Sequence, residues 1–187
     1  MKKVVLLGDS IRLWGYGTKV PEMLGEGYEV WQPEDNCRFV KYTLRGLFDW
    51  GDGIRGADII HWNNGLWDCT EIFDDGLFTS EEEYIENMVR VAKLLLKITP
   101  NVIFATTTPV WDEFEWTHND KIKRFNEIIV PELVKLGVKI NDLHSAVASD
   151  VHRYIKECDM IHLSDEGIDL CAKMVVDAVK SFEQEKG

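Results

Sequence analysis

Two short segments of this sequence carry side chains that together could perform nucleophilic catalysis. The first is Gly8-Asp9-Ser10, which directly follows an apolar run and can present the serine hydroxyl at the end of a strand. A serine becomes a nucleophile when a histidine takes its proton, and that histidine needs an acceptor on its other ring nitrogen. The segment Asp159-Met160-Ile161-His162 offers both partners, because a carboxylate three residues before His162 can reach its Nδ1 in a tight loop.

A third segment, His61-Trp62-Asn63-Asn64, stands at the end of another apolar run. A side-chain amide placed there can donate to the oxyanion that forms when an acyl group is attacked. Each of the three segments also has an ordinary explanation, since Gly, Asp, Ser and Asn are common in turns and short motifs often match by chance. Taken singly, each segment is better explained as a turn or a chance match than as part of a catalytic site.

The elements that must position these segments alternate between short strands and longer helices. Apolar and β-branched runs predict strands at residues 4–7, 29–31, 57–62, 101–106 and 138–140. Apolar residues at helical spacing predict four helices: 43–50, one from the Ser80–Glu83 capping box to Pro100, 119–136 interrupted at Pro131, and 164–182. This alternation is typical of a three-layer α/β/α sandwich on a mostly parallel sheet of about five strands. We expect one domain over residues 1–187, with ligands outside the carboxyl ends of the strands.

The composition argues against several classes of partner. The chain has 21 basic and 33 acidic side chains, a net charge of −12, so it is not expected to bind nucleic acid or an anionic membrane. No apolar run reaches the roughly 20 residues that span a bilayer. The first apolar stretch is too short for a secretory signal, and we expect a cytoplasmic protein. The scattered cysteines, with neither disulfide nor zinc-site spacing, are expected to be free thiols: Cys37, Cys69, Cys158 and Cys171.

Taken together and in this order, the three segments resemble the SGNH (GDSL) hydrolases over nearly the whole chain. The resemblance implies a flavodoxin-like α/β/α fold and a serine esterase that needs neither a metal nor another cofactor. Ser10 would be the nucleophile, His162 the base and Asp159 the group that orients it. The oxyanion would be bound by the backbone N–H of Ser10, the Asn63 amide and the backbone N–H of Lys41, which stands where the family has a glycine.

The resemblance also implies the kind of substrate. Because related enzymes include carbohydrate deacetylases, we expect a small-molecule ester, with an acetyl group on a sugar as the preferred case. Five of the seven tryptophans fall in or near segments expected at the cleft: Trp14, Trp62, Trp67, Trp111 and Trp116. About half of these are expected to be packing residues instead. The residues predicted to contact the substrate are Trp14, Asn64, Trp67 and Thr108.

Two other classes of function remain as alternatives. The first is a non-catalytic module of the same fold that binds a small molecule or carbohydrate, which the replacement of the family glycine by Lys41 favours. The intact set Ser10, Asp159 and His162 argues against it. The second is a nucleotide or phosphate binder, which is disfavoured because the turn after the first strand lacks a G-x-G-x-x-G or P-loop pattern and carries Asp9.

Overall fold

A five-stranded parallel sheet forms the centre of the computed structural model, which describes residues 1–73 and 75–184. The strand order is β2-β1-β3-β4-β5. Residues 4 to 7 in β1 are fully buried, as expected for a central parallel strand with helices on both faces. The strands are β1 (Lys2–Leu7), β2 (Tyr28–Trp31), β3 (Ile59–Trp62), β4 (Val102–Ala105) and β5 (Lys139–Asn141).

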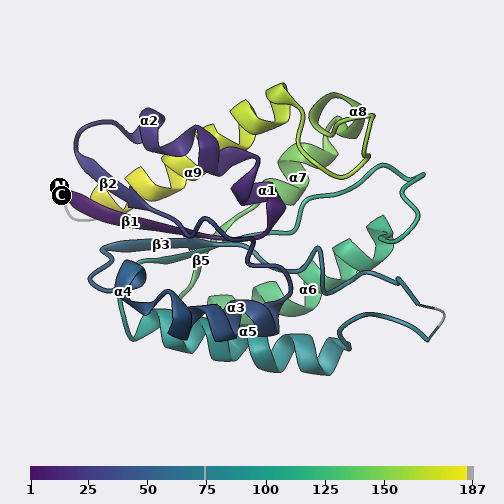
Figure 1. The fold of residues 1–187 in the computed structure, drawn as a ribbon, viewed down its shortest axis with the longest axis horizontal. Helices are drawn as coiled ribbons and strands as arrows, with labels where there is room; N and C mark the ends of the chain where they lie inside the picture. The colour runs from purple at the N-terminus through teal and green to yellow at the C-terminus, as the bar shows by residue number, and fades with distance from the viewer. Residues whose placement is uncertain (74, 185–187) are drawn as a thin grey trace.

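Helices cover both faces of this sheet and give the three layers visible in Figure 1. One face carries α1 (Ser10–Leu13), α2 (Val20–Leu24), α7 (Leu143–Ala148), α8 (Val151–Tyr154) and α9 (Asp165–Gln184), with the short 3-10 helix η1 (Tyr16–Thr18) between the first two. The other face carries α3 (Val40–Asp49), α4 (Gly51–Ile54), α5 (Glu81–Leu96) and α6 (Asn119–Lys135). None of the described helices combines the length and apolar character needed to cross a lipid bilayer.

The expected α/β/α sandwich is confirmed, and all five expected strands are present within two residues of their predicted bounds. The four longer predicted helices correspond to α3, α5, α6 and α9. Ser80 caps α5 as predicted, with its Oγ accepting from the N–H of Glu83 at 3.2 Å. The expected interruption at Pro131 is wrong, because α6 continues through it. Pro131 lies on the exposed side of α6, where water can bond the carbonyl that lacks an N–H partner.

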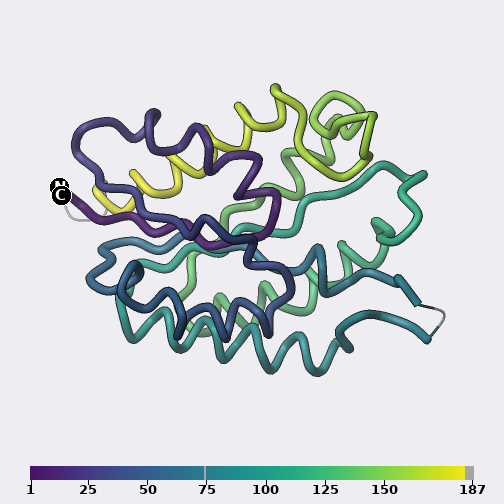
Figure 2. The backbone as a smooth tube through the Cα atoms, in the orientation of Figure 1, coloured from purple at the N-terminus to yellow at the C-terminus, as the bar shows by residue number. Residues whose placement is uncertain are grey.

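The sheet reverses its order at β1, which pairs with β2 on one side and β3 on the other. In such sheets the connections after the two central strands leave toward opposite faces, and ligands bind between them. Figure 2 shows the segments that follow β1, β3 and β4 gathered at the sheet edge opposite the N-terminus. The fold therefore brings Gly8-Asp9-Ser10 and Asn63-Asn64 together at the carboxyl ends of their strands.

The buried guanidinium of Arg12 fastens the connection after β1 to the connection after β2. Its Nη2 donates to the carbonyl oxygens of Gly8 at 3.0 Å and Asp35 at 2.7 Å, and its Nη1 donates to that of Pro33 at 2.8 Å. Arg12 has no exposed surface. These bonds satisfy backbone carbonyl groups in irregular segments, where no strand or helix supplies their hydrogen-bond partners.

We predict that Arg12→Met lowers the free energy of unfolding by about 3 kcal/mol or more, because two buried carbonyls and one half-buried carbonyl lose a charged donor. The midpoint of urea unfolding measures this change. Arg45→Met is the control: Arg45 is bonded to Asp49, but its side chain is 69% exposed, so its removal should change stability by less than about 1 kcal/mol. Equal losses in the two variants would contradict the structural role of Arg12.

Candidate active site

Ser10 begins helix α1 directly after the central strand β1. Asp9 caps this helix, with its Oδ1 accepting from the N–H of Ile11 at 2.9 Å. The N–H of Gly8 donates to Cys37 Sγ at 3.1 Å. Hydrogen bonds at Gly8 and at Ile11 therefore stabilise the turn before and after Asp9. Ser10 retains 5% exposure, which leaves its hydroxyl at the floor of a cavity rather than in the core.

Gly8 and Asn63 meet where β1 and β3 end side by side. The N–H of Asn63 donates to the Leu7 carbonyl oxygen at 3.1 Å, and the Asn63 side chain lies directly against the Cα of Gly8. A Cβ at Gly8 would lie 1.9 Å from Asn63 Oδ1, far closer than a Cβ approaches a nonbonded heavy atom. Glycine at this position is therefore what lets the amide of Asn63 reach the turn that carries Ser10.

Asp159 and His162 form a closed loop just before α9. Asp159 Oδ1 accepts from the backbone N–H groups of Ile161 at 3.1 Å and His162 at 2.9 Å, while its Oδ2 lies 3.1 Å from His162 Nδ1. Met160 adopts a positive φ of 62° in this loop, and its carbonyl oxygen accepts from the N–H of Trp111 at 3.0 Å. With Nδ1 on the carboxylate, the opposite nitrogen Nε2 is free to act on a substrate.

The electrostatics of this loop favour an ionised Asp159. Its partial burial raises the pKa, but the two backbone N–H groups and the His162 ring outweigh burial and hold the pKa below its usual value. Asp9 is the opposite case, since full burial raises its pKa against the lowering effects of the Asn63 amide, the Ile11 N–H, Arg12 and His162. The second oxygen of Asp9 has no hydrogen-bond partner among the described residues.

Ser10 and His162 line the same cavity, which has a volume of about 300 Å³. Most of its other walls are aromatic or aliphatic side chains from four separate segments. His162 is flanked by Trp14, whose ring meets the imidazole edge-on with centroids 5.2 Å apart. The remaining lining residues are Asn36, Leu66, Trp67, Thr70, Ile72, Phe78, Phe114, Trp116, Thr117 and Ile161.

Of the residues predicted to contact substrate, Trp14 and Trp67 line this cavity and the other two do not. Asn64 is fully buried, with its Oδ1 accepting from Trp62 Nε1 at 2.7 Å and its Nδ2 donating to the Arg38 carbonyl oxygen at 2.9 Å. Thr108 is buried and, with Asp9 and Asn63, lines a smaller neighbouring pocket that shares Leu66 with the cavity, so Asn63 does not line the cavity itself. The expectation for Asn64 and Thr108 is corrected, because tertiary packing turns both side chains inward.

Lys41 is likewise not brought to the cavity. It lies in the first turn of α3, and its ammonium is paired with Glu83 of α5 on the exposed surface. The connection after β2 instead reaches the cavity through Asn36, whose Oδ1 accepts from the N–H of Arg38 at 2.7 Å. Arg38 adopts a positive φ of 48° there, a backbone conformation that is rare for residues other than glycine.

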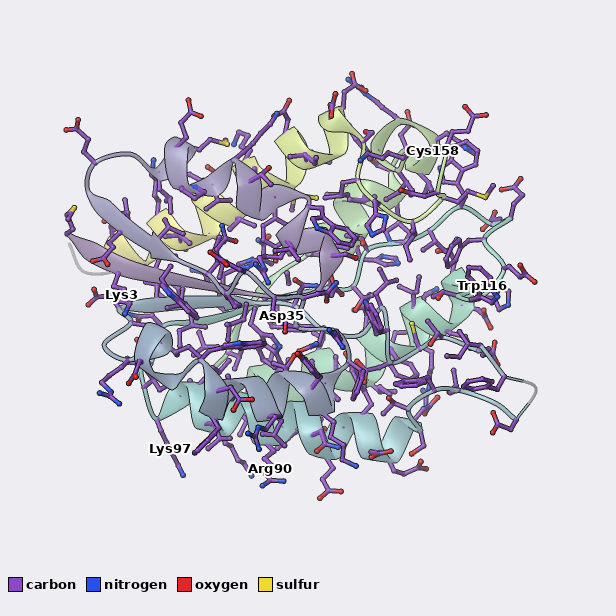
Figure 3. The ribbon with its side chains drawn as sticks, viewed as in Figure 1. Lys3, Asp35, Arg90, Lys97, Trp116 and Cys158 are labelled. Atoms are coloured by element: carbon purple, nitrogen blue, oxygen red, sulfur yellow. The ribbon has the colours of Figure 1, made fainter. Side chains whose placement is uncertain are left out.

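Three of the five tryptophans expected near the cleft line the cavity, namely Trp14, Trp67 and Trp116. Trp62 is buried in the sheet, and Trp111 donates from its Nε1 to the Ile155 carbonyl oxygen at 3.2 Å. Figure 3 shows Trp116 at the end of the molecule beyond the carboxyl ends of the strands. The lining residues that sequence reasoning missed are Asn36, Leu66, Thr70, Ile72, Phe78, Phe114, Thr117 and Ile161, which share no pattern beyond lying near the predicted motifs.

No protein-family model matches this sequence, and no curated protein matches it either. Several solved structures do share its fold. A lipase/acylhydrolase from Enterococcus faecalis superposes with a TM-score of 0.77 at 19% identity, covering 97% of this chain and 96% of that one. A GDSL-like lipase from Bacteroides thetaiotaomicron gives 0.76 at 19% identity, covering 96% and 88%. An acetylxylan esterase from Geobacillus stearothermophilus gives 0.75 at 15% identity, covering 95% and 94%. The chain has the fold of the GDSL hydrolases.

In this GDSL hydrolase fold, Asp68 anchors the segment that follows β3 and supplies much of the cavity wall. Both oxygens of its buried carboxylate accept from the N–H of Val40 at 3.1 Å, and one also accepts from Thr79 Oγ1 at 3.0 Å. The carboxylate thus joins the start of α3 to the residues just before α5. Burial raises the pKa of Asp68 to about 7, and the hydrogen bonds reduce that rise only in part.

We predict that Asp68 makes the protein less stable as the pH rises from about 4 to above 7. The native state holds the Asp68 proton up to a pKa of about 7, whereas an unfolded aspartate loses it near pH 3.9, so the stabilisation from this proton is complete below about pH 4 and is lost through pH 7. Urea unfolding of the wild type and Asp68→Asn at pH 5 and pH 8 measures this change.

Because all other titrating groups are shared, the stability difference between wild type and Asp68→Asn isolates this carboxyl group. The wild type should lose more stability than the variant on going from pH 5 to pH 8. Asp52→Asn is the control, since that side chain is 95% exposed and should leave the pH dependence unchanged. The same pH dependence in wild type and Asp68→Asn would show that Asp68 is not the group responsible.

Proposed function

We propose that this protein is a serine-dependent ester hydrolase of the SGNH (GDSL) family that acts through an acyl-serine intermediate. Ser10 is the nucleophile, His162 the general base, and Asp159 the carboxylate that orients it. The observation that carries the proposal is that Ser10 and His162 line one cavity while Asp159 Oδ2 lies 3.1 Å from His162 Nδ1. A base oriented by a third group and facing the same space as a serine is the arrangement that serine hydrolysis requires.

The reaction follows from these positions. His162 Nε2 accepts the proton of Ser10 as Oγ attacks the ester carbonyl carbon, and the carbonyl oxygen becomes an oxyanion. The Ser10 N–H, at the start of α1, and the Asn63 amide are the donors proposed for that oxyanion. His162 then gives the proton to the leaving alcohol. Water, deprotonated by the same imidazole, attacks the acyl-serine and releases the acid with Ser10 restored.

For the substrate we propose a small acyl group, acetyl in the preferred case, on a carbohydrate or another small ester. A cavity of about 300 Å³ lies at the small end of the range for ligand sites. The tryptophans at its rim provide flat faces of the kind that pack against the C–H face of a sugar ring. The acetylxylan esterases among the structures of similar fold support this choice by analogy at the level of the fold.

A second candidate is an ester whose bound group is purely apolar. It is favoured by the shortage of polar side chains in the cavity, where Asn36, Thr70 and Thr117 are the polar lining residues besides Ser10 and His162. A sugar needs hydrogen bonds for its hydroxyl groups, whereas a hydrocarbon needs only apolar contact. The two candidates share the same reaction and differ in what fills the space between the aromatic walls.

Ser10→Ala is expected to abolish hydrolysis of p-nitrophenyl acetate, because no other nucleophile in the proposed mechanism can form the acyl intermediate. The rate should fall by about 10⁴-fold or more. Ser149→Ala is the matched control, since Ser149 is an exposed serine whose Oγ donates to the Ala146 carbonyl oxygen, and its rate should equal the wild type. A fluorophosphonate should label the wild type at Ser10 and leave Ser10→Ala unlabelled.

Activity that survives in Ser10→Ala would disprove the serine mechanism. A wild-type chain that is folded, inactive on every ester tried and unlabelled by the fluorophosphonate would instead favour the non-catalytic binding module. Unfolding curves of all three proteins exclude loss of fold as the cause.

The substrate is tested by comparing kcat/KM for an acetylated xylo-oligosaccharide with that for p-nitrophenyl octanoate. The carbohydrate ester should be the better substrate by about tenfold or more if sugar stacking on the tryptophans contributes about 1.4 kcal/mol. A preference of similar size for the octanoate would support the apolar ester and reject the carbohydrate.

A further inference from the structure

The hydroxyl group of Tyr16 is buried against the side chain of Asn63. Tyr16 has no exposed surface and begins η1, on the sheet face that also carries α1. Its hydroxyl donates to Asn63 Oδ1 at 2.8 Å, and both partners are buried. A bond of this length between buried groups constrains how the amide can rotate.

The groups on the two sides of the Asn63 side chain determine where its amide oxygen and its amide N–H groups point. On one side lies Asp9, and the Asn63 amide lowers the pKa of this carboxyl group, as an N–H directed toward it would. The amide oxygen then faces Tyr16, which must donate. Burial raises the pKa of Tyr16 well above its ordinary value, so the hydroxyl keeps the proton that it donates.

The Tyr16 ring is itself in contact with β3, the strand that ends just before Asn63. The imidazole of His61 in β3 meets it edge-on, with centroids 5.4 Å apart and ring planes at 82°. His61 is fully buried, its Nε2 lies 3.2 Å from Asn141 Nδ2, and burial lowers its pKa to about 3. The ring that supports Tyr16 is therefore neutral at any pH at which the protein would work. A glycine at position 61 could not supply such a contact.

We propose that Tyr16 is a positioning residue that holds the Asn63 amide in the one orientation that presents an N–H to the oxyanion. An amide has two N–H groups, so one can face Asp9 while the other remains for the substrate. Rotated by 180°, the amide would turn its oxygen toward Asp9 and lose its donor. This inference rests on the proposed function, since it assigns how one of the proposed oxyanion donors is oriented.

The test is a double-mutant cycle on p-nitrophenyl acetate hydrolysis. Tyr16→Phe should lower kcat by about 10- to 100-fold with KM unchanged, because the amide acts only on the charge that develops in the transition state. Asn63→Ala should lower kcat by about 10²–10³-fold. In the Asn63→Ala background, Tyr16→Phe should have no further effect on kcat, because its only route to the reaction has been removed.

Tyr84→Phe is the matched control. Tyr84 is also fully buried, and its hydroxyl donates to a backbone carbonyl, that of Asn64, at 3.3 Å, so it loses a buried hydroxyl without releasing the Asn63 side chain. Its kcat should equal that of the wild type. A merely structural role for Tyr16 would give kcat losses that multiply in the double variant, and thermal unfolding of each variant identifies any that do not fold.

The outcomes separate this inference from the proposed function. Wild-type activity that disappears in Ser10→Ala but is unchanged in Tyr16→Phe overturns the positioning role alone. Multiplying losses in the double variant also overturn it. A folded wild type with neither hydrolysis nor fluorophosphonate labelling overturns the proposed function, and the positioning role with it.

Discussion

The close contact between Gly8 and Asn63 determines the arrangement of this edge of the sheet. β1 and β3 are adjacent and parallel, so their ends leave the sheet side by side, and a side chain on either residue must fit between the two connections. The Asn63 side chain fits because position 8 has no Cβ, which would lie 1.9 Å from Asn63 Oδ1. As a result the turn with Ser10, the amide of Asn63 and the hydroxyl of Tyr16 lie within one hydrogen-bonded cluster.

Two buried ionisable side chains, Arg12 and Asp9, lie beside this cluster. The guanidinium of Arg12 has carbonyl oxygens as its closest partners, and the carboxylate of Asp9 has one oxygen without a partner among the described residues. Burial raises the pKa of Asp9 and Arg12 lowers it, so the guanidinium offsets part of the cost of burying that carboxyl group. Polar groups fixed in this way do not need to reorganise when charge develops beside them, which is what an oxyanion site requires.

The regular elements could be predicted because their apolar side chains form a continuous run, as in β1, or repeat with a helical period, as in α5 and α9. The short helices were not predicted: α1, η1, α2, α4, α7 and α8 span three to six residues each, too few to display a period.

At the site, topology and local spacing were enough to predict that Ser10 and His162 line one cavity. Local sequence could not set the direction of a loop side chain, which depends on contacts far along the chain. Lys41 therefore pairs with Glu83, and Asn64 bonds Arg38 and Trp62.

The candidate site divides into a polar floor and an apolar wall that are built independently. The floor is formed at the ends of β1 and β3, where backbone pairing fixes every position. The wall is formed by connections that meet away from the sheet, such as the backbone N–H of Glu71 bonded to the Trp116 carbonyl oxygen at 2.8 Å, and its tryptophans remain 40–59% exposed: Trp14, Trp67 and Trp116. Burying that aromatic surface against a substrate would contribute binding energy without touching the groups beneath. Under the proposed function, changes in the wall would alter which ester binds while leaving the polar groups of the floor intact.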